Sequence, residues 1–340
     1  MPLSRPTRPV LLLASLLALA SCRSRGEGGA RDRAFLGEGQ RPAAFDFSHP
    51  LQSLRLDAGD AAARAGSFAW QGRVEWTAYK PGVAPIHAVE RHRLRQLATG
   101  DFHVDAEIDP GTDPSAVTGR EVVYAGRMTY ARGQWAPFRE RPSDGGHDAR
   151  RFRDDSFRAA ASLAELLGPS LRATPAGDAT VLGRAARRYA LALAEGVAPP
   201  AQKAPQGLPD SGYDADTRRH LAFLEGRVPT SASGELVLDA ETGVPLEVEL
   251  RAAFTERDDR QLRVEALVDA RVTALGAGVE PVRAPEGALT DERKPKGVAR
   301  ALEAAGLRKR GAPAAERAEP EEEDEEGQGD EAPRGRRETP

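Results

Sequence analysis

Residues 244–272 read VPLEVELRAAFTERDDRQLRVEALVDARV, and no other stretch indicates the fold class as strongly. Apolar residues occupy every second position on both sides of the polar segment 255–261. Period two is the spacing of a β-strand with one buried face. The stretch predicts a long antiparallel hairpin, and something must cover its apolar face. That face carries Val244, Leu246, Val248, Leu250, Ala252 and Phe254, and then Leu262, Val264, Ala266, Val268, Ala270 and Val272.

The same alternation recurs upstream and predicts further strands. One strand, ending at the turn Lys80-Pro-Gly82, has Phe68, Trp70, Val74, Trp76 and Ala78 on one face. A hairpin through the loop 98–100 follows, and its outer face pairs residues of opposite charge, which stabilises a sheet. In this register Arg95 opposes His103, Arg93 opposes Asp105, Arg91 opposes Glu107, and Leu94 opposes Val104.

The remaining elements complete a mainly β (α+β) fold over residues 46–290. Strands are predicted at 121–124, 127–130, 181–193 and 236–238, with turns at 125–126 and 239–243. A helix is predicted over 155–167, with Asp155 or Ser156 as N-cap and Gly168-Pro169 as its end. Proline-rich residues 195–232 are interpreted as a loop insertion with a short helix at 214–224. The prediction is a curved antiparallel sheet or incomplete barrel wrapped over one or a few helices.

The N-terminus has the pattern of a secretory signal peptide over residues 1–21. Arg5 and Arg8 precede an apolar run from Val10 to Ala20, which is too short to span the roughly 30 Å hydrocarbon core of a bilayer. Leu19-Ala-Ser-Cys22 matches the bacterial lipobox, so Cys22 is the predicted lipidation site. The alternative is an ordinary signal peptide with a chance cysteine. Residues 22–45, rich in Gly and Arg, are interpreted as a flexible tether.

The C-terminus is predicted to differ from the folded middle. Residues 291–310 include a short helix with apolar spacing at Val298, Ala301, Leu302 and Ala305. Residues 311–340 are interpreted as a disordered acidic tail, which either solubilises the chain or captures cations or a basic partner. The whole chain carries a net charge of −4. This charge argues against nucleic acid as a partner, because phosphate neutralisation needs clustered Lys and Arg.

Catalytic and metal-binding patterns are weak. The single cysteine excludes a disulfide framework, and the spacing of the six histidines does not predict zinc. Asp101, His103, Asp105, Glu107 and Asp109 form either an ion-paired face or, less plausibly given the opposed arginines, a calcium site. Ser231 and Ser233 are placed in a loop without a nucleophile motif. We therefore expect no enzyme activity, no cofactor and no metal. Trp135-Ala-Pro-Phe138 is either an exposed loop that enters a membrane or partner, or a buried hairpin end.

The lipobox, the turn Asp239-x-x-Thr242-Gly243-Val-Pro-Leu246 and the segments 182–184 and 189–191 resemble the lipoprotein carrier and receptor family of LolA and LolB, with the related LppX and LprG lipoproteins. In that family an incomplete barrel folds over helices and encloses a cavity for acyl chains. The resemblance implies that Cys22 becomes the acylated first residue. Arg23, where Asp would favour inner-membrane retention, implies the outer membrane, facing the periplasm. The candidate cavity residues are Phe68, Trp70, Trp76, Phe102, Val104, Val248, Leu250, Val264 and Val268.

Two functions remain open from the sequence. The first is a membrane-anchored, noncatalytic lipoprotein that binds or transfers an apolar ligand, namely lipid or lipoprotein acyl chains, in the β-sheet cavity. The second is a structural or assembly lipoprotein that holds another envelope protein. The first requires a cavity inside the sheet, whereas the second is compatible with a filled core and an exposed patch.

Overall fold

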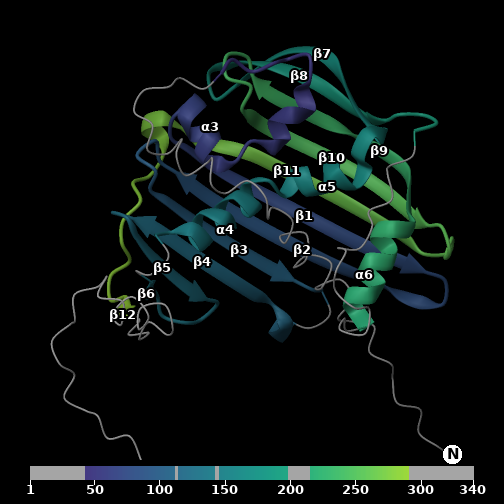
Figure 1. Ribbon diagram of the computed structural model, residues 1–340, viewed down its shortest axis with the longest axis horizontal. Helices are drawn as coiled ribbons and strands as arrows, with labels where there is room; N and C mark the ends of the chain where they lie inside the picture. Colours follow the sequence, from purple (N-terminus) through teal and green to yellow (C-terminus); the bar gives the residue numbers. More distant parts are fainter. Residues whose placement is uncertain (1–42, 112–113, 142–144, 198–214, 291–340) are drawn as a thin grey trace, which may run out of the picture. The chain divides into compact units, whose positions relative to one another are not determined.

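The computed structural model describes residues 43–111, 114–141, 145–197 and 215–290. They form one twelve-stranded sheet in the order β12-β6-β5-β4-β3-β2-β1-β11-β10-β9-β8-β7 (Figure 1). All neighbouring strands are antiparallel except β12 and β6. The sheet is curved and unclosed, with β12 and β7 at its edges, which confirms the predicted fold class. The strands are β1 (Phe68–Lys80), β2 (Val83–Gln96), β3 (Phe102–Asp109), β4 (Thr118–Ala125), β5 (Met128–Gly133), β6 (Arg139–Arg141), β7 (Leu171–Val181), β8 (Arg184–Leu193), β9 (Arg227–Asp239), β10 (Pro245–Glu256), β11 (Arg263–Leu275) and β12 (Leu289–Thr290).

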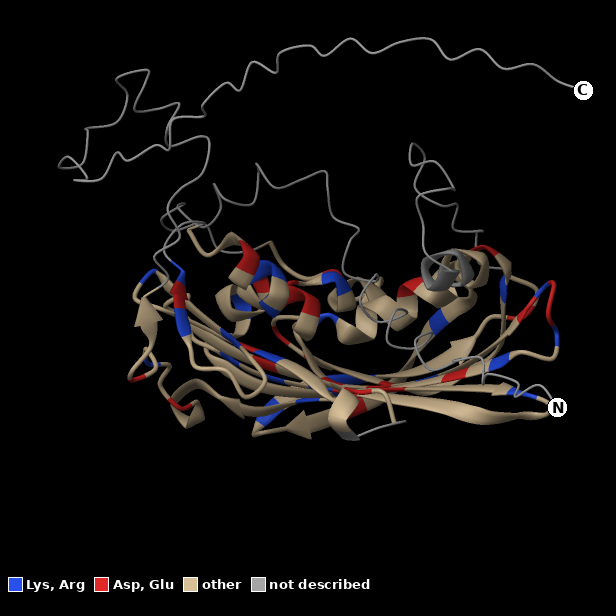
Figure 2. Cartoon of the chain, turned by 90° about the horizontal axis from the view of Figure 1, so that it is seen from below, with Lys and Arg blue, Asp and Glu red and all other residues tan. Residues whose placement is uncertain are grey.

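The helices of six or more residues lie on one face of this sheet (Figure 2). Among the described residues no helix is both long and apolar enough to cross a bilayer. We call the face beneath these helices the covered face and the opposite one the open face. The helices are η2 (Pro50–Arg55), α3 (Ala58–Ala65), α4 (His147–Phe157), α5 (Ala159–Leu167) and α6 (Ala215–Gly226), with the 3-10 turns η3 (Pro114–Ala116), η4 (Gly168–Ser170) and η6 (Gly276–Gly278).

Several predicted registers are confirmed. In the β2–β3 pair, Arg95, Arg93 and Arg91 oppose His103, Asp105 and Glu107, and Leu94 opposes Val104. The hairpin at 121–130 is β4–β5 around Ala125 and Met128. The strand predicted at 181–193 is confirmed from Arg184 onward, but its predicted start is wrong, because Val181 ends β7 and residues 182–183 form the turn between β7 and β8. The long hairpin is β10–β11, in which Leu250 opposes Val268. These pairings are local, so alternation and turn residues were sufficient to predict them.

The predicted helix at 155–167 is two helices, and its predicted start is wrong. The first, α4, begins at His147 and ends at Phe157. Arg158 interrupts the helix, and α5 begins at Ala159. Asp155 and Ser156 therefore lie inside α4 and are not N-caps. The sequence does not predict the early part of α4, because its buried positions, which include Ala149 and Arg153, do not form a stripe of large apolar residues. The predicted end at Leu167 is confirmed, and Gly168 follows with a φ of 55°.

The predicted insertion loop at 195–232 is partly wrong. Residues 227–232 are the first half of β9, so Ser231 lies in a strand, as does Ser233 further along it. Helix α6 confirms the short helix expected within this segment. Strand β7 was not predicted, because only its two ends, Leu171 and Val181, are buried and no alternation marks it.

Several predictions fall on residues outside the described ranges. These are the signal peptide, Cys22, most of the tether, the helix at 291–310 and the acidic tail. The final residues of the predicted tether are described. Phe45 packs against the turn at Gly243 and contacts Phe47 edge-on at 5.1 Å between ring centroids, so the packed part of the chain begins before residue 46.

Candidate functional site

The nine residues predicted to line a cavity all lie on the covered face of the sheet. Each is at most 8% exposed, and all belong to one cluster of buried residues. They come from β1, β3, β10 and β11. Val248 and Leu250 stand beside the β11 residues Ala270 and Val268. The structure therefore brings these predicted residues together in a single apolar layer beneath the helices.

Helices α4 and α5 cover this layer. Phe157, the last residue of α4, contacts Phe68 and Trp70 at ring-centroid distances of 5.3 and 5.6 Å. Helix α5 begins with three buried alanines, Ala159, Ala160 and Ala161, whose small side chains allow a helix to lie close to a sheet.

The space left between helices and sheet is small. Within the described part of the chain, a cavity of about 10 Å³ lies beneath the junction of α4 and α5. A cavity of that size holds at most about one water molecule. It is lined by Trp70, Phe157, Arg158, Ala160, Ala161, Leu246, Val248 and Ala270, with Leu54 and Pro245. In this conformation the space beneath the junction is too small for an acyl chain, and the nine predicted residues are packed in one buried cluster.

A buried polar cluster fastens α4 to the sheet. Arg153, only 3% exposed, donates from Nε to Asp154 Oδ1 at 2.8 Å and from Nη1 to Gln96 Oε1 of β2 at 3.2 Å. Its guanidinium also lies 5.0 Å from the ring centroid of Phe102. Asp154 accepts a further bond from the backbone N–H of Ala58 in α3, at 3.2 Å. One arginine thus links α4, the sheet and, through Asp154, α3.

Burial affects the protonation of the acid in this cluster. Burial raises the pKa of Asp154, and the adjacent Arg153 guanidinium opposes this rise. Neither charge is well hydrated, so each depends on the other for compensation.

The Asp-x-x-Thr-Gly turn between β9 and β10 is a second buried polar cluster. Asp239 is 1% exposed and accepts hydrogen bonds from Arg184 of β8. Its Oδ1 also accepts from the backbone N–H and the hydroxyl of Thr242, at 2.8 and 2.7 Å. Gly243 has a φ of 70°, and a Cβ there would lie 2.0 Å from the Phe45 ring. The residues that carried the family resemblance therefore act in this structure as a turn that holds β8, β9, β10 and the N-terminal segment together.

We expect the Asp239 contacts to make stability depend on pH. Burial would raise the pKa of Asp239, but hydrogen bonds from Arg184 and Thr242 outweigh it and hold the pKa below its usual value. A lowered pKa stabilises the fold above the unfolded value of about 3.9, and this stabilisation disappears as the pH falls through the folded pKa. Asp239→Asn should cost about 1–3 kcal/mol at pH 7, and the cost should shrink below about pH 4.

Urea denaturation of wild type and Asp239→Asn at pH 7 and pH 3 measures this difference. Glu235→Gln is the matched control, because Glu235 forms a half-exposed pair with Arg188 on the neighbouring strand. Such a pair contributes about 0–1 kcal/mol. An Asp239→Asn cost that is the same at both pH values would contradict the assigned ion pair.

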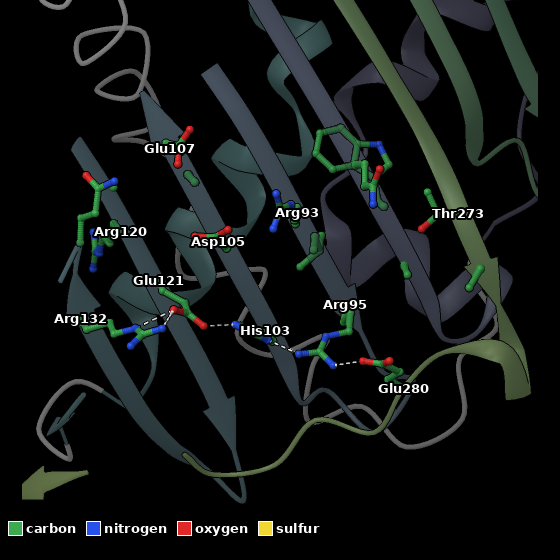
Figure 3. A pocket seen from close by; sticks show the side chains of 18 of the residues that line it. Arg93, Arg95, His103, Asp105, Glu107, Arg120, Glu121, Arg132, Thr273 and Glu280 are labelled. Carbon is green, nitrogen blue, oxygen red and sulfur yellow. Dashed lines mark hydrogen bonds and ion pairs between the residues drawn. The ribbon is translucent and has the colours of Figure 1, made fainter. Parts of the chain in front are cut away.

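A larger recess lies on the open face (Figure 3). It has a volume of about 830 Å³ and crosses β5, β4, β3, β2, β1 and β11. The segment after β11, with Gly278 and Glu280, and the turn after β5, with Gln134 and Trp135, also line it. We call this recess the outer groove.

Charged side chains in the outer groove form a chain of contacts. His103 Nε2 lies 2.7 Å from Glu121 Oε1, and Arg132 Nε donates to Glu121 Oε2 at 2.6 Å. Arg95 contacts His103 Nδ1 and also donates to Glu280 at 2.6 Å. Figure 3 shows these residues side by side, extending from β5 to the segment after β11. The arrangement ties four neighbouring strands to that segment.

Two acids of the groove have pKa values shifted in opposite directions. Burial, with repulsion from Glu121, raises the pKa of Asp105 against the attraction of Arg93. The hydrogen bond with His103, joined by those with Arg132, lowers the pKa of Glu121 against the effect of burial. Among the described residues no group of three or more His, Cys, Asp or Glu is arranged to hold a metal ion.

The sequence pattern did not predict this groove. The sequence indicates only an ion-paired face on β2 and β3. The groove also needs side chains from β1, β11 and the segment after β11, and these come together only in the folded sheet. Trp135 is 93% exposed, so the buried alternative for its loop is wrong. In the sequence, the one indication of an exposed ring here is a tryptophan that stands between Gly133 and Pro137, outside any alternating apolar pattern.

No protein-family model matches the chain, and none of the curated proteins matches its sequence. Among solved structures the chain is similar to a DUF1329 family protein from Desulfovibrio piger, with 10% identity, a TM-score of 0.21, and coverage of 68% of this chain and 94% of the other. It is also similar to a LolA superfamily protein from Nitrosomonas europaea, with 11% identity, a TM-score of 0.18, and coverage of 66% of this chain and 94% of the other. A third similar structure is a domain from Vibrio parahaemolyticus described as an outer-membrane lipoprotein-sorting protein. It has 12% identity and a TM-score of 0.21, and the match covers 68% of this chain and 93% of the other. LolA superfamily proteins and lipoprotein-sorting domains are thus among the solved structures that this chain resembles.

Proposed function

We propose that this chain is a noncatalytic, membrane-tethered lipoprotein that binds an acyl chain of a lipid or lipoprotein against the covered face of its sheet. The supporting observation is the small cavity beneath the junction of α4 and α5. It lies between the apolar layer of β1, β10 and β11 and a helix pair that is interrupted at Arg158.

Binding requires these helices to move, because about 10 Å³ cannot hold an acyl chain. The junction residues Phe157, Arg158, Ala160 and Ala161 all line the cavity, so displacement of the junction enlarges it directly. Each buried methylene of a ligand would contribute about 0.8 kcal/mol, which offsets the free-energy cost of moving the helices away from the sheet.

Native mass spectrometry of the full chain, incubated with oleate or with phosphatidylethanolamine vesicles, tests this function. We expect a one-to-one lipid adduct that organic extraction removes. Ala161→Leu, which places a larger side chain in the cavity, should reduce the adduct. Ala190→Leu on β8 is the control, because Ala190 is exposed. Circular dichroism of both variants establishes that they fold.

Absence of an adduct with both probes would contradict acyl-chain binding and favour the alternative function, assembly with another envelope protein. An adduct that Ala161→Leu and Ala190→Leu affect equally would show that lipid binds away from the helix junction.

The proposed anchor is Cys22, and the proposed location is the outer membrane, facing the periplasm. Cys22 is the single cysteine of the chain. Two or more acyl chains hold a protein on a membrane essentially permanently, whereas the unacylated chain has no such anchor. Cys22→Ala should therefore move the protein from the membrane fraction to the soluble fraction, as measured by fractionation and immunoblotting. Retention of the signal-cleaved variant in the membrane fraction would contradict lipidation as the anchor.

A further inference from the structure

The outer groove lies on the opposite face of the sheet from the proposed acyl-chain site, and acyl-chain binding does not use it. Its volume of about 830 Å³ falls within the range of about 300–1,000 Å³ typical of sites for small ligands. Its lining comes from six strands and two connecting segments, so the fold fixes its shape.

Most charges in the groove are balanced in pairs. Arg120, which also belongs to the lining, instead places its guanidinium 4.7 Å from the ring centroid of Phe152. Glu121 contacts His103 and Arg132, and Glu280 contacts Arg95. The other two carboxylates, Asp105 and Glu107, oppose Arg93 and Arg91 across the β2–β3 register. A strongly charged ligand would meet repulsion and attraction in similar measure along this groove. Its electrostatics therefore suit a ligand without net charge.

Paired charges also fix hydrogen-bonding groups in place. Carboxylates accept and guanidinium groups donate, so each pair offers both kinds of bond within a short distance. Gln71 and Thr273 add exposed polar groups to the lining, and Gln134 adds a buried side-chain oxygen without a partner among the described residues. A ligand rich in hydroxyl groups, each both donor and acceptor, matches such a lining.

An exposed aromatic ring completes the groove. Trp135 lines it, is 93% exposed, and has a φ of 64° in the left-handed region. A bulky residue in that region costs about 1–3 kcal/mol, a strain typical of ligand-binding positions. The other two tryptophans, Trp70 and Trp76, are buried on the covered face. The indole of Trp135 offers a flat apolar surface beside many polar groups.

Sugars combine these two properties, because a pyranose ring has hydroxyl groups around its edge and C–H groups on its faces. We propose that the outer groove binds a neutral oligosaccharide. Trp135 stacks on a sugar face, while Arg93 with Asp105, and Gln71, bind its hydroxyl groups. Glycines at 119 and 133 leave part of the lining without side chains.

Calorimetric titration of the full chain with tetra-N-acetylchitotetraose and with maltotetraose tests this site. Tryptophan fluorescence gives a second readout, because Trp135 alone among the three tryptophans is exposed. We expect saturable binding of at least one tetrasaccharide. Trp135→Ala and Arg93→Ala should each weaken it about tenfold or more, while Trp135→Phe retains it. Arg172→Ala, at an exposed position on β7, should leave it unchanged.

Titration with citrate and with trilysine covers charged ligands. Binding of citrate that is lost in Arg93→Ala, or binding of trilysine that is lost in Asp105→Asn, without binding of a tetrasaccharide, would overturn the proposal in favour of a charged ligand. Failure of both tetrasaccharides to bind at millimolar concentration would also overturn it. These outcomes are independent of lipid adducts on the covered face.

Discussion

Arg153→Ala is expected to lower the free energy of unfolding by about 3–5 kcal/mol. The substitution leaves the largely buried Asp154 carboxyl without its charged partner, and it removes the hydrogen bond that Gln96 Oε1 accepts inside the protein. Gln96 is 1% exposed, so water cannot replace that bond without a local opening. The loss is large relative to the typical total stability of about 5–15 kcal/mol.

Urea denaturation at pH 7, followed by circular dichroism, measures the effect. Arg151→Ala is the matched control on the same helix, because Arg151 is half-exposed and lies 3.8 Å from Asp155. A surface pair of this kind contributes about 0–1 kcal/mol. If the two variants differ by less than about 1 kcal/mol, the cluster around Arg153 does not fasten α4 to the sheet.

Val248→Asp is expected to cost about 4–5 kcal/mol, close to the whole stability of a protein at the lower end of the usual range of about 5–15 kcal/mol. Val248 is buried on β10, where it opposes Ala270 of β11 and Leu236 of β9. None of these neighbours can compensate a carboxylate, so the new side chain would be charged, desolvated and unpaired. Burial would raise the pKa of this new carboxyl, so the cost should decrease at lower pH, where the side chain is neutral.

The comparison for this variant is Arg251→Asp, three positions along the same strand. Arg251 is exposed on the open face, so a carboxylate there remains hydrated. Thermal unfolding at pH 7 and pH 4 distinguishes the two variants. A Val248→Asp protein as stable as Arg251→Asp would contradict the assignment of Val248 to the covered face.

The helices over the sheet show why the candidate site was only partly predictable. The alternation in β1, β3, β10 and β11 identified nine residues of the apolar layer correctly as residues of one buried face. The same alternation is compatible with an open cavity or a filled core, because it reports which side of a strand avoids water and not what covers it. Helices α4 and α5 occupy that space, and the buried Arg153 gave no apolar signal in the sequence.

Strands β7 and β9 show a similar limit. Strand β7 is an edge strand with exposed Thr, Pro and Gly residues, so its pairing with β8 leaves little trace in hydrophobic periodicity. Residues 230–234 of β9 are small and mostly polar, and the place of this part of the strand in the sheet depends on β10. In both segments backbone hydrogen bonds to a neighbouring strand outweigh a weak local pattern.

Sequence patterns alone were sufficient for the β class, the hairpins β2–β3, β4–β5 and β10–β11, and the pairing of arginines with acids on the open face. These features depend on residues that are close along the chain, where alternation and turn chemistry act directly. The pairing of β1 with β11, the filling of the covered face and the outer groove depend on segments far apart along the chain. Arg153 and Gln96 are 57 residues apart, and Arg95 and Glu280 are 185 apart. Such long-range pairings follow from the balance of packing over the whole sheet, which no local period encodes.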